Sequence, residues 1–274
     1  MLCSPRVQSD KWFLKMYIDS HTHLFLKEFD TDRDEVIKRA IHAGVRKMFL
    51  PNIDDRTIQP MLYLTSLYPE NLYPMMGLHP TSVKKNYREQ LHIIEEWLNK
   101  DKFYAIGETG IDLYWDKSHL AEQQDSFIQH IRFSRDSGLP LIIHSRESFH
   151  EIFKILDQEL SGDVTGIFHS FTGSLDQARE IINFGFKMGI GGIVTFKNSG
   201  LDHVIASIGV SQIVLETDSP YLAPVPFRGK RNEPSYLIFT AQKIADILNM
   251  SIEEVEQITT LNAMNIYRTA NLNS

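Results

Sequence analysis

Short apolar runs alternate with longer amphipathic stretches from one end of the chain to the other. Runs such as residues 48–50 (MFL) and 141–143 (LII) are continuously apolar, which is typical of parallel strands buried on both faces. This pattern predicts strands at Tyr17–His23, Val45–Asn52, Leu72–Leu78, Phe103–Glu108, Leu139–His144, Val164–His169, Phe186–Ile190 and Gln212–Glu216.

The stretches between these runs have the length and spacing of amphipathic helices. They predict helices at Asp32–Ala43, Asp55–Tyr68, Arg88–Leu98, Ala121–Ser137, Phe149–Glu159, Leu175–Phe184, Leu201–Ile208, Glu233–Leu248 and Ser251–Tyr267, with Asn232 as the N-cap of the eighth. Repeated strand–helix units of this length favour an α/β fold, a single-domain (β/α)₈ TIM barrel. The alternative is a doubly wound parallel sheet.

The cysteine content, the apolar runs and the net charge argue against several classes of protein. The single cysteine, Cys3, excludes a disulfide framework and argues against a cysteine-based zinc site, as expected for a reducing, cytoplasmic compartment. No apolar run approaches the roughly 20 residues that a membrane span needs. The net charge of −7 argues against a protein that coats nucleic acid passively, but an enzyme with a local basic site is compatible with it.

The first residues differ from the rest of the chain. Residues 1–15 precede the first strand-like run and are interrupted by Asp10, Lys11 and Lys15, so they do not form a secretory signal. We expect them to be an extension, with Met16 as the true start and residues 16–274 as the barrel. No feature indicates an obligate protein partner, and a monomer is expected.

Candidate chemistry begins with His21 and His23 at the end of the first predicted strand. Residues two apart on a strand face the same side, so both imidazoles are expected to point together. A His-x-His pair alone is a weak signal, because a hydrogen-bonded polar pair at a strand end is equally plausible.

The signal strengthens because other predicted strands also end in residues that bind metals. These residues are Glu108, His144, His169 and Asp218. Barrel enzymes build their active sites at the carboxyl ends of different strands, so the same pattern on five strands favours one site over five accidents. Six ligands exceed the needs of one catalytic zinc and suit two divalent ions about 3.5–4 Å apart, with Glu108 as the bridge.

The ligand types restrict the metal only in part. Four imidazoles and two carboxylates suit Zn²⁺, Mn²⁺ or Ni²⁺ better than the all-oxygen cage typical of Mg²⁺. The set is permissive, so Zn²⁺, Mn²⁺ and Mg²⁺ all stay candidates for the two divalent metal ions.

The motifs resemble those of the TatD-like metal-dependent deoxyribonucleases, in the metallo-dependent hydrolase superfamily. The resemblance covers Tyr17 to about Tyr267 and leaves out residues 1–15. It is carried by IDSHTHL (18–24), GLHP (77–80), IGETGIDLYW (106–115), LIIHSR (141–146), FHSFTGS (168–174), GIGGIVTFKNS (189–199) and LETDSPYLAPVPFRGKRNEP (215–234).

The resemblance implies which residues hold which metal. One ion is expected at His21, His23, Glu108 and Asp218, and the second at Glu108, His144 and His169. The activity that it implies is hydrolysis of DNA phosphodiester bonds by a metal-activated water, with Asp218 and Glu108 as catalytic residues and Asp218 as general base. We expect a 3′–5′ exonuclease, although the residues themselves leave exonuclease or endonuclease action, polarity, and DNA or RNA open.

The DNA substrate needs cations at the same edge of the barrel. Arg146 follows His144, Arg228 and Arg231 follow the eighth strand, and His79 ends the third, so we expect these four to contact substrate. Ordinary solvated charges are the alternative, including pairing of Arg228 and Arg231 with Glu233. Tyr114, Trp115 and Tyr221 lie near the same edge and could stack on a base, although aromatic residues there are as often packing residues.

Two other functions compete with the nuclease. A hydrolase of small-molecule esters, amides or phosphoesters would keep the metals and change the bond. The absence of a lysine at the end of a barrel strand, where related amidases carry a modified bridging lysine, and the basic segment at 228–231 both favour a phosphodiester. A scaffold that binds metal without catalysis is the third possibility, which the six ligand-type residues make improbable.

A chain that begins at Met16 is expected to keep the stability and activity of the full-length protein. The physical reason is that the predicted barrel and all candidate ligands lie after residue 16. Thermal unfolding and substrate turnover of the two proteins, measured side by side, check this. A large loss in either quantity would make residues 1–15 part of the working protein.

Overall fold

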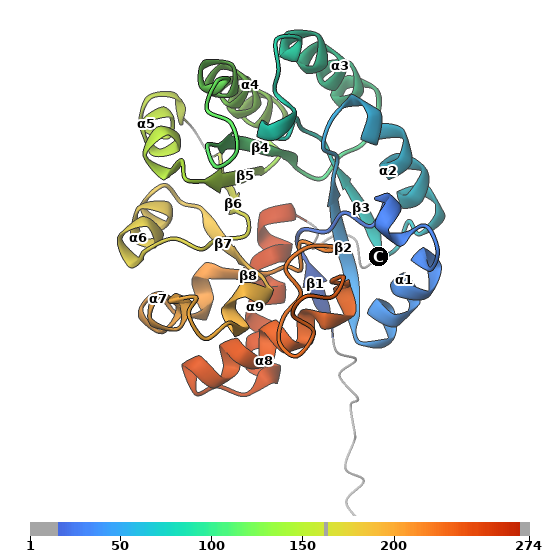
Figure 1. Cartoon of the computed structure of the whole chain (residues 1–274), viewed down its shortest axis with the longest axis vertical. Helices are drawn as coiled ribbons and strands as arrows, with labels where there is room; N and C mark the ends of the chain where they lie inside the picture. The colour runs from blue at the N-terminus through green and yellow to red at the C-terminus, as the bar shows by residue number, and fades with distance from the viewer. Residues whose placement is uncertain (1–15, 162–163, 269–274) are drawn as a thin grey trace, which may run out of the picture.

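Residues 16–161 and 164–268, which the computed structural model describes, form a ring of eight parallel strands surrounded by helices (Figure 1). Residues 1–15, the expected extension, lie outside the described residues. The strands are β1 (Tyr17–Asp19), β2 (Val45–Pro51), β3 (Leu72–Met75), β4 (Ile106–Asp112), β5 (Leu141–Arg146), β6 (Gly166–Phe168), β7 (Lys187–Ile190) and β8 (Ile213–Leu215).

Helices follow the strands along the chain, as the amphipathic pattern predicts. They are α1 (Arg33–His42), α2 (Asp55–Leu67), α3 (Tyr87–Lys100), α4 (Leu120–Ser137), α5 (Phe149–Glu159), α6 (Leu175–Asn183), α7 (Leu201–Ile208), α8 (Leu237–Leu248) and α9 (Ile252–Tyr267). Within the part of the chain that the structure describes, no helix is long and apolar enough to cross a membrane.

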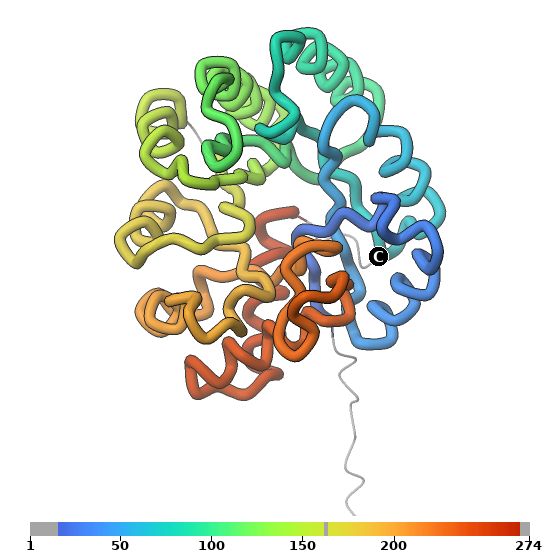
Figure 2. The backbone as a smooth tube through the Cα atoms, in the orientation of Figure 1, coloured from blue at the N-terminus to red at the C-terminus, as the bar shows by residue number. Residues whose placement is uncertain are grey.

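Backbone hydrogen bonds close the ring where regular pairing stops. The strands pair in the orders β1-β2-β3 and β4-β5-β6-β7-β8. Between β8 and β1, Ser20 N donates to Leu215 O at 2.9 Å, and between β3 and β4, Gly107 N donates to Met76 O at 2.7 Å. The chain runs once around the ring, which brings its last strand beside its first (Figure 2). The predicted barrel is confirmed, because a doubly wound sheet would leave its first and last strands apart.

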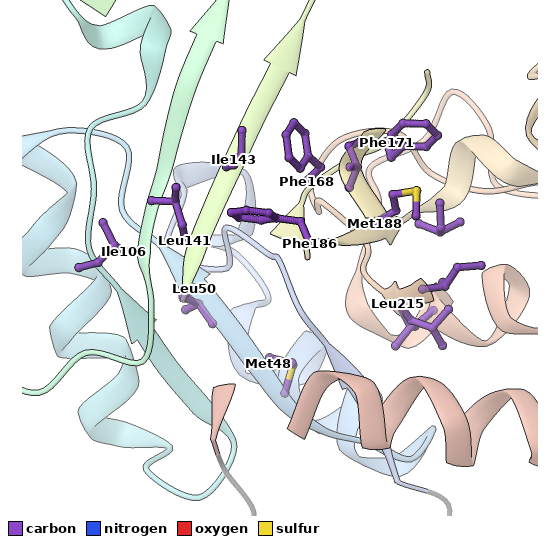
Figure 3. Close-up of a cluster of buried hydrophobic side chains, with 14 of the residues drawn as sticks. Met48, Leu50, Ile106, Leu141, Ile143, Phe168, Phe171, Phe186, Met188 and Leu215 are labelled. Atoms are coloured by element: carbon purple, nitrogen blue, oxygen red, sulfur yellow. The ribbon is translucent and has the colours of Figure 1, made fainter. Parts of the chain in front are cut away.

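Alternating side chains of the strands enter two apolar clusters, which explains why the strand sequences are apolar without a break. One cluster fills the barrel and includes Phe49 and Ile142. Tyr267 of α9 completes it by stacking on Phe49, with ring centroids 3.6 Å apart. The other cluster lies between strands and helices and includes Leu50 and Phe168 (Figure 3).

The strand ends near the candidate ligands differ from the prediction. β1 stops at Asp19, so His21 and His23 follow the strand, whereas β4 continues four residues beyond Glu108 to Asp112. The cause is Gly110, which pairs with His144 at a φ of +136°. A β-carbon at Gly110 would lie 2.1 Å from the carbonyl oxygen of His144, so only glycine allows β4 to pair with β5 at this position. Because glycine is typical of turns, the sequence pattern predicted that the strand ends before it.

The segment before α8 is the second correction. Asn232 does not cap a helix; its buried side-chain amide donates to the carbonyl oxygens of Thr217 and Tyr221, both at 2.7 Å. Glu233 instead precedes a short 3₁₀ turn (Pro234–Tyr236), and α8 begins at Leu237. Asn232 therefore holds the segment after β8 in place.

Replacing Gly110 by alanine is expected to lower the free energy of unfolding by at least about 3 kcal/mol, because the new methyl group overlaps backbone and the φ is unfavourable. Gly185→Ala is the matched control: Gly185 also has a positive φ, +81°, but open space around it. That control should cost about 1 kcal/mol. Urea unfolding of both variants measures the difference, and equal midpoints would show that the Gly110 contact is unimportant.

Candidate metal centre

The six sequence-predicted ligands come together at the carboxyl ends of the barrel strands. His21 and His23 follow β1, and Glu108 and His144 lie within β4 and β5. The remaining two, His169 and Asp218, follow β6 and β8. His21, His23, Glu108 and His169 are buried, whereas the side chain of Asp218 is 14% exposed and borders solvent.

The Glu108 carboxylate is the centre of the cluster. Its Oε2 atom lies 3.1 Å from His21 Nε2 and 3.7 Å from His23 Nε2. Its Oε1 atom lies 2.8 Å from both His144 Nδ1 and His169 Nε2. Each oxygen therefore faces a different set of imidazoles, so the carboxylate could be shared by two cations.

Asp218 completes the side of the cluster that contains His21 and His23. Its Oδ1 atom is 3.5 Å from His23 Nε2 and 3.9 Å from His21 Nε2. The residue has a φ of +53°, and its backbone N–H donates to the carbonyl oxygen of His21 at 2.9 Å. This bond between the segments after β8 and β1 fixes the carboxylate beside the imidazoles.

The donor atoms fit divalent cations in both spacing and chemistry. Those of His21, His23 and Glu108 lie within 4.8 Å of one another, as do those of His79, Glu108 and His144. Imidazole nitrogens with carboxylate oxygens are ligands that Zn²⁺ and Mn²⁺ accept. The geometry allows a cation on either side of Glu108.

Charge balance in this buried cluster depends on Glu108. Burial opposes its ionisation, but the imidazoles of His169, His79 and His21 outweigh burial and hold the pKa of Glu108 well below its usual value. Burial lowers the pKa of His21 and favours its neutral form. Burial also opposes a charge on His169, yet Glu108 and Glu216 raise the pKa of His169 well above its usual value. A cation that binds His169 must therefore displace a proton.

Two carboxylates that the sequence interpretation missed lie beside the ligand imidazoles. Asp112 Oδ2 lies 3.0 Å from His144 Nε2, and Glu216 Oε1 lies 3.4 Å from His169 Nδ1. The Asp112 contact is a hydrogen bond, which is the kind of contact that fixes the ring orientation of a metal-binding histidine. Their only sequence signal is an acidic residue in an apolar strand end, as in Ile111-Asp112 and Leu215-Glu216.

The histidine expected to bind substrate lies within the cluster itself. His79 Nε2 is 3.3 Å from Glu108 Oε1, and His79 Nδ1 is 2.7 Å from the hydroxyl of Thr81. His79 is thus nearer to Glu108 than the expected ligand His23, at 3.7 Å, and farther than His21, His144 and His169. Its role as a substrate contact stays a prediction.

The three arginines expected to bind substrate have different surroundings. Arg146 and Arg228 are exposed and lie over aromatic rings. Arg231 makes two 2.7 Å bonds to the carboxylate of Asp32, so its guanidinium is occupied by a structural ion pair. Glu233, the partner expected for these arginines, pairs with Arg39 instead.

Comparison with known proteins agrees with this geometry. The family model described as TatD related DNase matches residues 18–268. The metal-dependent hydrolase YabD of Bacillus subtilis is 39% identical over 254 residues, which are 92% of this chain and 99% of YabD.

Solved structures give the same result. The crystal structure of YjjV, a TatD homologue from Escherichia coli K12, has a TM-score of 0.87 at 28% identity and covers 93% of this chain and 99% of YjjV. A TatD family hydrolase from Entamoeba histolytica has a TM-score of 0.80 at 22% identity, covers 92% of this chain and 98% of its own, and supports the fold. With a match over nearly its whole length and metal-binding residue types at five strand ends, the chain belongs to the TatD-related DNase family of metal-dependent hydrolases.

Proposed function

We propose that this hydrolase cleaves DNA phosphodiester bonds, as a 3′–5′ exonuclease, with two divalent cations that share Glu108. The observation that carries the proposal is the division of the Glu108 carboxylate between two pairs of imidazoles, His21 with His23 and His144 with His169. Bound there, the cations would supply an activated water and neutralise charge on the phosphoryl oxygens. The family description as DNase supports DNA as the substrate.

The residues of the chain supply the remaining chemistry. Burial opposes the charge on Asp218, but the hydrogen bond to His23 and the nearby imidazoles lower the pKa of Asp218 below its usual value. At neutral pH this carboxylate is therefore ionised and can bind a cation. Its place beside His21 and His23 at the border with solvent, and not its pKa, makes it the candidate to accept a proton from the attacking water. Asp112 keeps His144 turned toward Glu108 through a 3.0 Å hydrogen bond, and Glu216 places a second carboxylate 3.4 Å from His169 Nδ1.

The substrate is held by groups around this cluster. Arg146 and Arg228 are exposed, and their side chains make no ion pair with the residues that the structure describes. A guanidinium group binds phosphate through paired N–H donors, which suits these two residues to the DNA backbone. Arg231 would have to leave Asp32 to do the same, so we assign the contact to Arg146 and Arg228. We further propose a monomeric, cytoplasmic enzyme.

Removal of metal is expected to abolish DNA hydrolysis, since the proposed water activation depends on it. Single- and double-stranded oligonucleotides labelled at one end would be incubated with chelator-treated protein, with Mg²⁺, Mn²⁺ and Zn²⁺ restored separately. Cleavage should return with at least one ion, and shortening from the 3′ end should appear as a ladder. If two ions bind per chain but neither DNA is cleaved, the nuclease proposal is wrong. The substrate would then be sought among small-molecule esters, amides or phosphoesters.

Asp218→Asn is expected to lower kcat for DNA hydrolysis by about 10²–10⁴-fold, because asparagine cannot accept the proton. The melting temperature should stay close to that of the wild type, because asparagine has the same shape. Asp176→Asn is the matched control, since Asp176 lies at the start of α6 with a side chain that is 91% exposed. Unchanged turnover by the Asp218 variant would remove this residue from the mechanism.

A further inference from the structure

An exposed aromatic cluster lies beside the metal centre. It consists of Tyr114 and Trp115, which follow β4, and Arg146 at the end of β5, and we call it the β4–β5 platform. Among the exposed large apolar side chains in the described ranges, Trp115 is the most exposed, at 76%, and Tyr114 is 47% exposed. Packing within the chain therefore does not account for the indole of Trp115, whose apolar surface stays in water.

The three side chains of the platform order one another. The rings of Tyr114 and Trp115 are perpendicular, with centroids 4.6 Å apart. The guanidinium of Arg146 lies 3.9 Å from the centroid of Tyr114 and 5.9 Å from that of Trp115. Because Arg146 makes these cation–π contacts and no ion pair within residues 16–161 and 164–268, its N–H donors are free for a ligand.

The platform is joined rigidly to the metal centre. Arg146 and His144 are two residues apart in β5 and therefore face the same side. The Asp112 carboxylate contacts both the metal centre and the platform. Its Oδ2 atom lies 3.0 Å from His144 Nε2, and its Oδ1 atom accepts a 3.0 Å hydrogen bond from the backbone N–H of Tyr114. A ligand on the platform would thus be placed at a fixed distance from the cations.

We propose that the β4–β5 platform binds an unpaired nucleobase of the DNA strand whose phosphodiester lies over the metal centre, with the base stacked on Trp115 and Arg146 paired with a phosphate. The inference rests on the proposed nuclease function. Every base has an apolar face that stacks on an aromatic ring, so such a site accepts any sequence. Arg146 supplies the charge that distinguishes a nucleotide from an uncharged aromatic ligand.

A stacking site of this kind selects unpaired DNA. A base inside a duplex is covered by its neighbours on both faces, and it must leave the stack before it can contact Trp115. The platform therefore favours single strands and frayed ends over blunt duplex ends.

A thermodynamic cycle between Trp115 and the base tests the inference. The probe is a fluorescein-labelled tetrathymidylate with hydrolysis-resistant phosphorothioate linkages, together with four versions that each lack one base. Binding to the wild type, Trp115→Ala and Trp115→Phe is measured by anisotropy with Mn²⁺ present. Tyr63→Ala is the matched control, because Tyr63 is a similarly exposed aromatic residue, 68%, on α2.

Removal of one particular base should weaken binding to the wild type about ten-fold. Trp115→Ala should weaken binding of the intact probe by a similar factor. The affinity of this variant should not fall further when that base is removed from the probe. Trp115→Phe should restore most of the affinity and the sensitivity, and Tyr63→Ala should behave as wild type. Additive losses from the protein and DNA changes, or an equal loss in Tyr63→Ala, would overturn the inference.

This binding cycle, together with the metal-restoration cleavage assay above, separates this inference from the proposed function. Metal-dependent cleavage of DNA without coupling between Trp115 and any base would leave the nuclease standing and overturn the platform. Coupling without cleavage would retain the platform as a nucleic-acid site and overturn hydrolysis. Failure of the probe to bind at all, with no cleavage in the other assay, would overturn both.

Discussion

The structure around the mouth of the barrel depends on one buried negative charge. Glu108 is 2% exposed, and a carboxylate in such a place is stable as an anion only when it is compensated. Three imidazoles, within or just after β1, β5 and β6, provide this compensation. They belong to His21, His144 and His169, which all lie within 3.1 Å of the Glu108 oxygens. Removal of the carboxylate alone would leave these imidazoles without their shared partner.

Close backbone approach brings these groups together. Gly110 allows β4 to stay paired with β5 beyond Glu108, which aligns Asp112 with Arg146. Gly189 in β7 leaves room for a side chain instead, since a β-carbon there would lie 2.0 Å from Oε2 of Glu216. Below the ligands, Asp19 accepts hydrogen bonds from the backbone N–H and hydroxyl of Thr217 at 2.9 and 2.6 Å, which ties β1 to the segment that carries Asp218.

Sequence patterns predicted the barrel and its principal polar residues because both follow from local periodicity. Each strand is an apolar run, and a histidine or carboxylate at its end is visible in one short segment. Contacts between residues far apart in the sequence could not be predicted in this way. Asp112 and Glu216 matter through their contacts with His144 and His169, and the pairing of Arg231 with Asp32 joins residues far apart in the chain. No single segment contains those partners, so the pattern offered only Glu233 for Arg231.

The net charge of −7 repels a polyanion at long range, so the DNA substrate proposed above would need a local concentration of positive charge. Bound cations would supply positive charge at the centre of the barrel mouth, and Arg146 and Arg228 would supply it at the edges. Both guanidinium groups lie over aromatic rings, of Tyr114 and Phe196, instead of beside carboxylates. A ring positions a guanidinium without neutralising it, so each arginine keeps its full charge and its hydrogen-bond donors for phosphate. Ion pairing, as in Arg231, would have fixed the side chain at the cost of that charge.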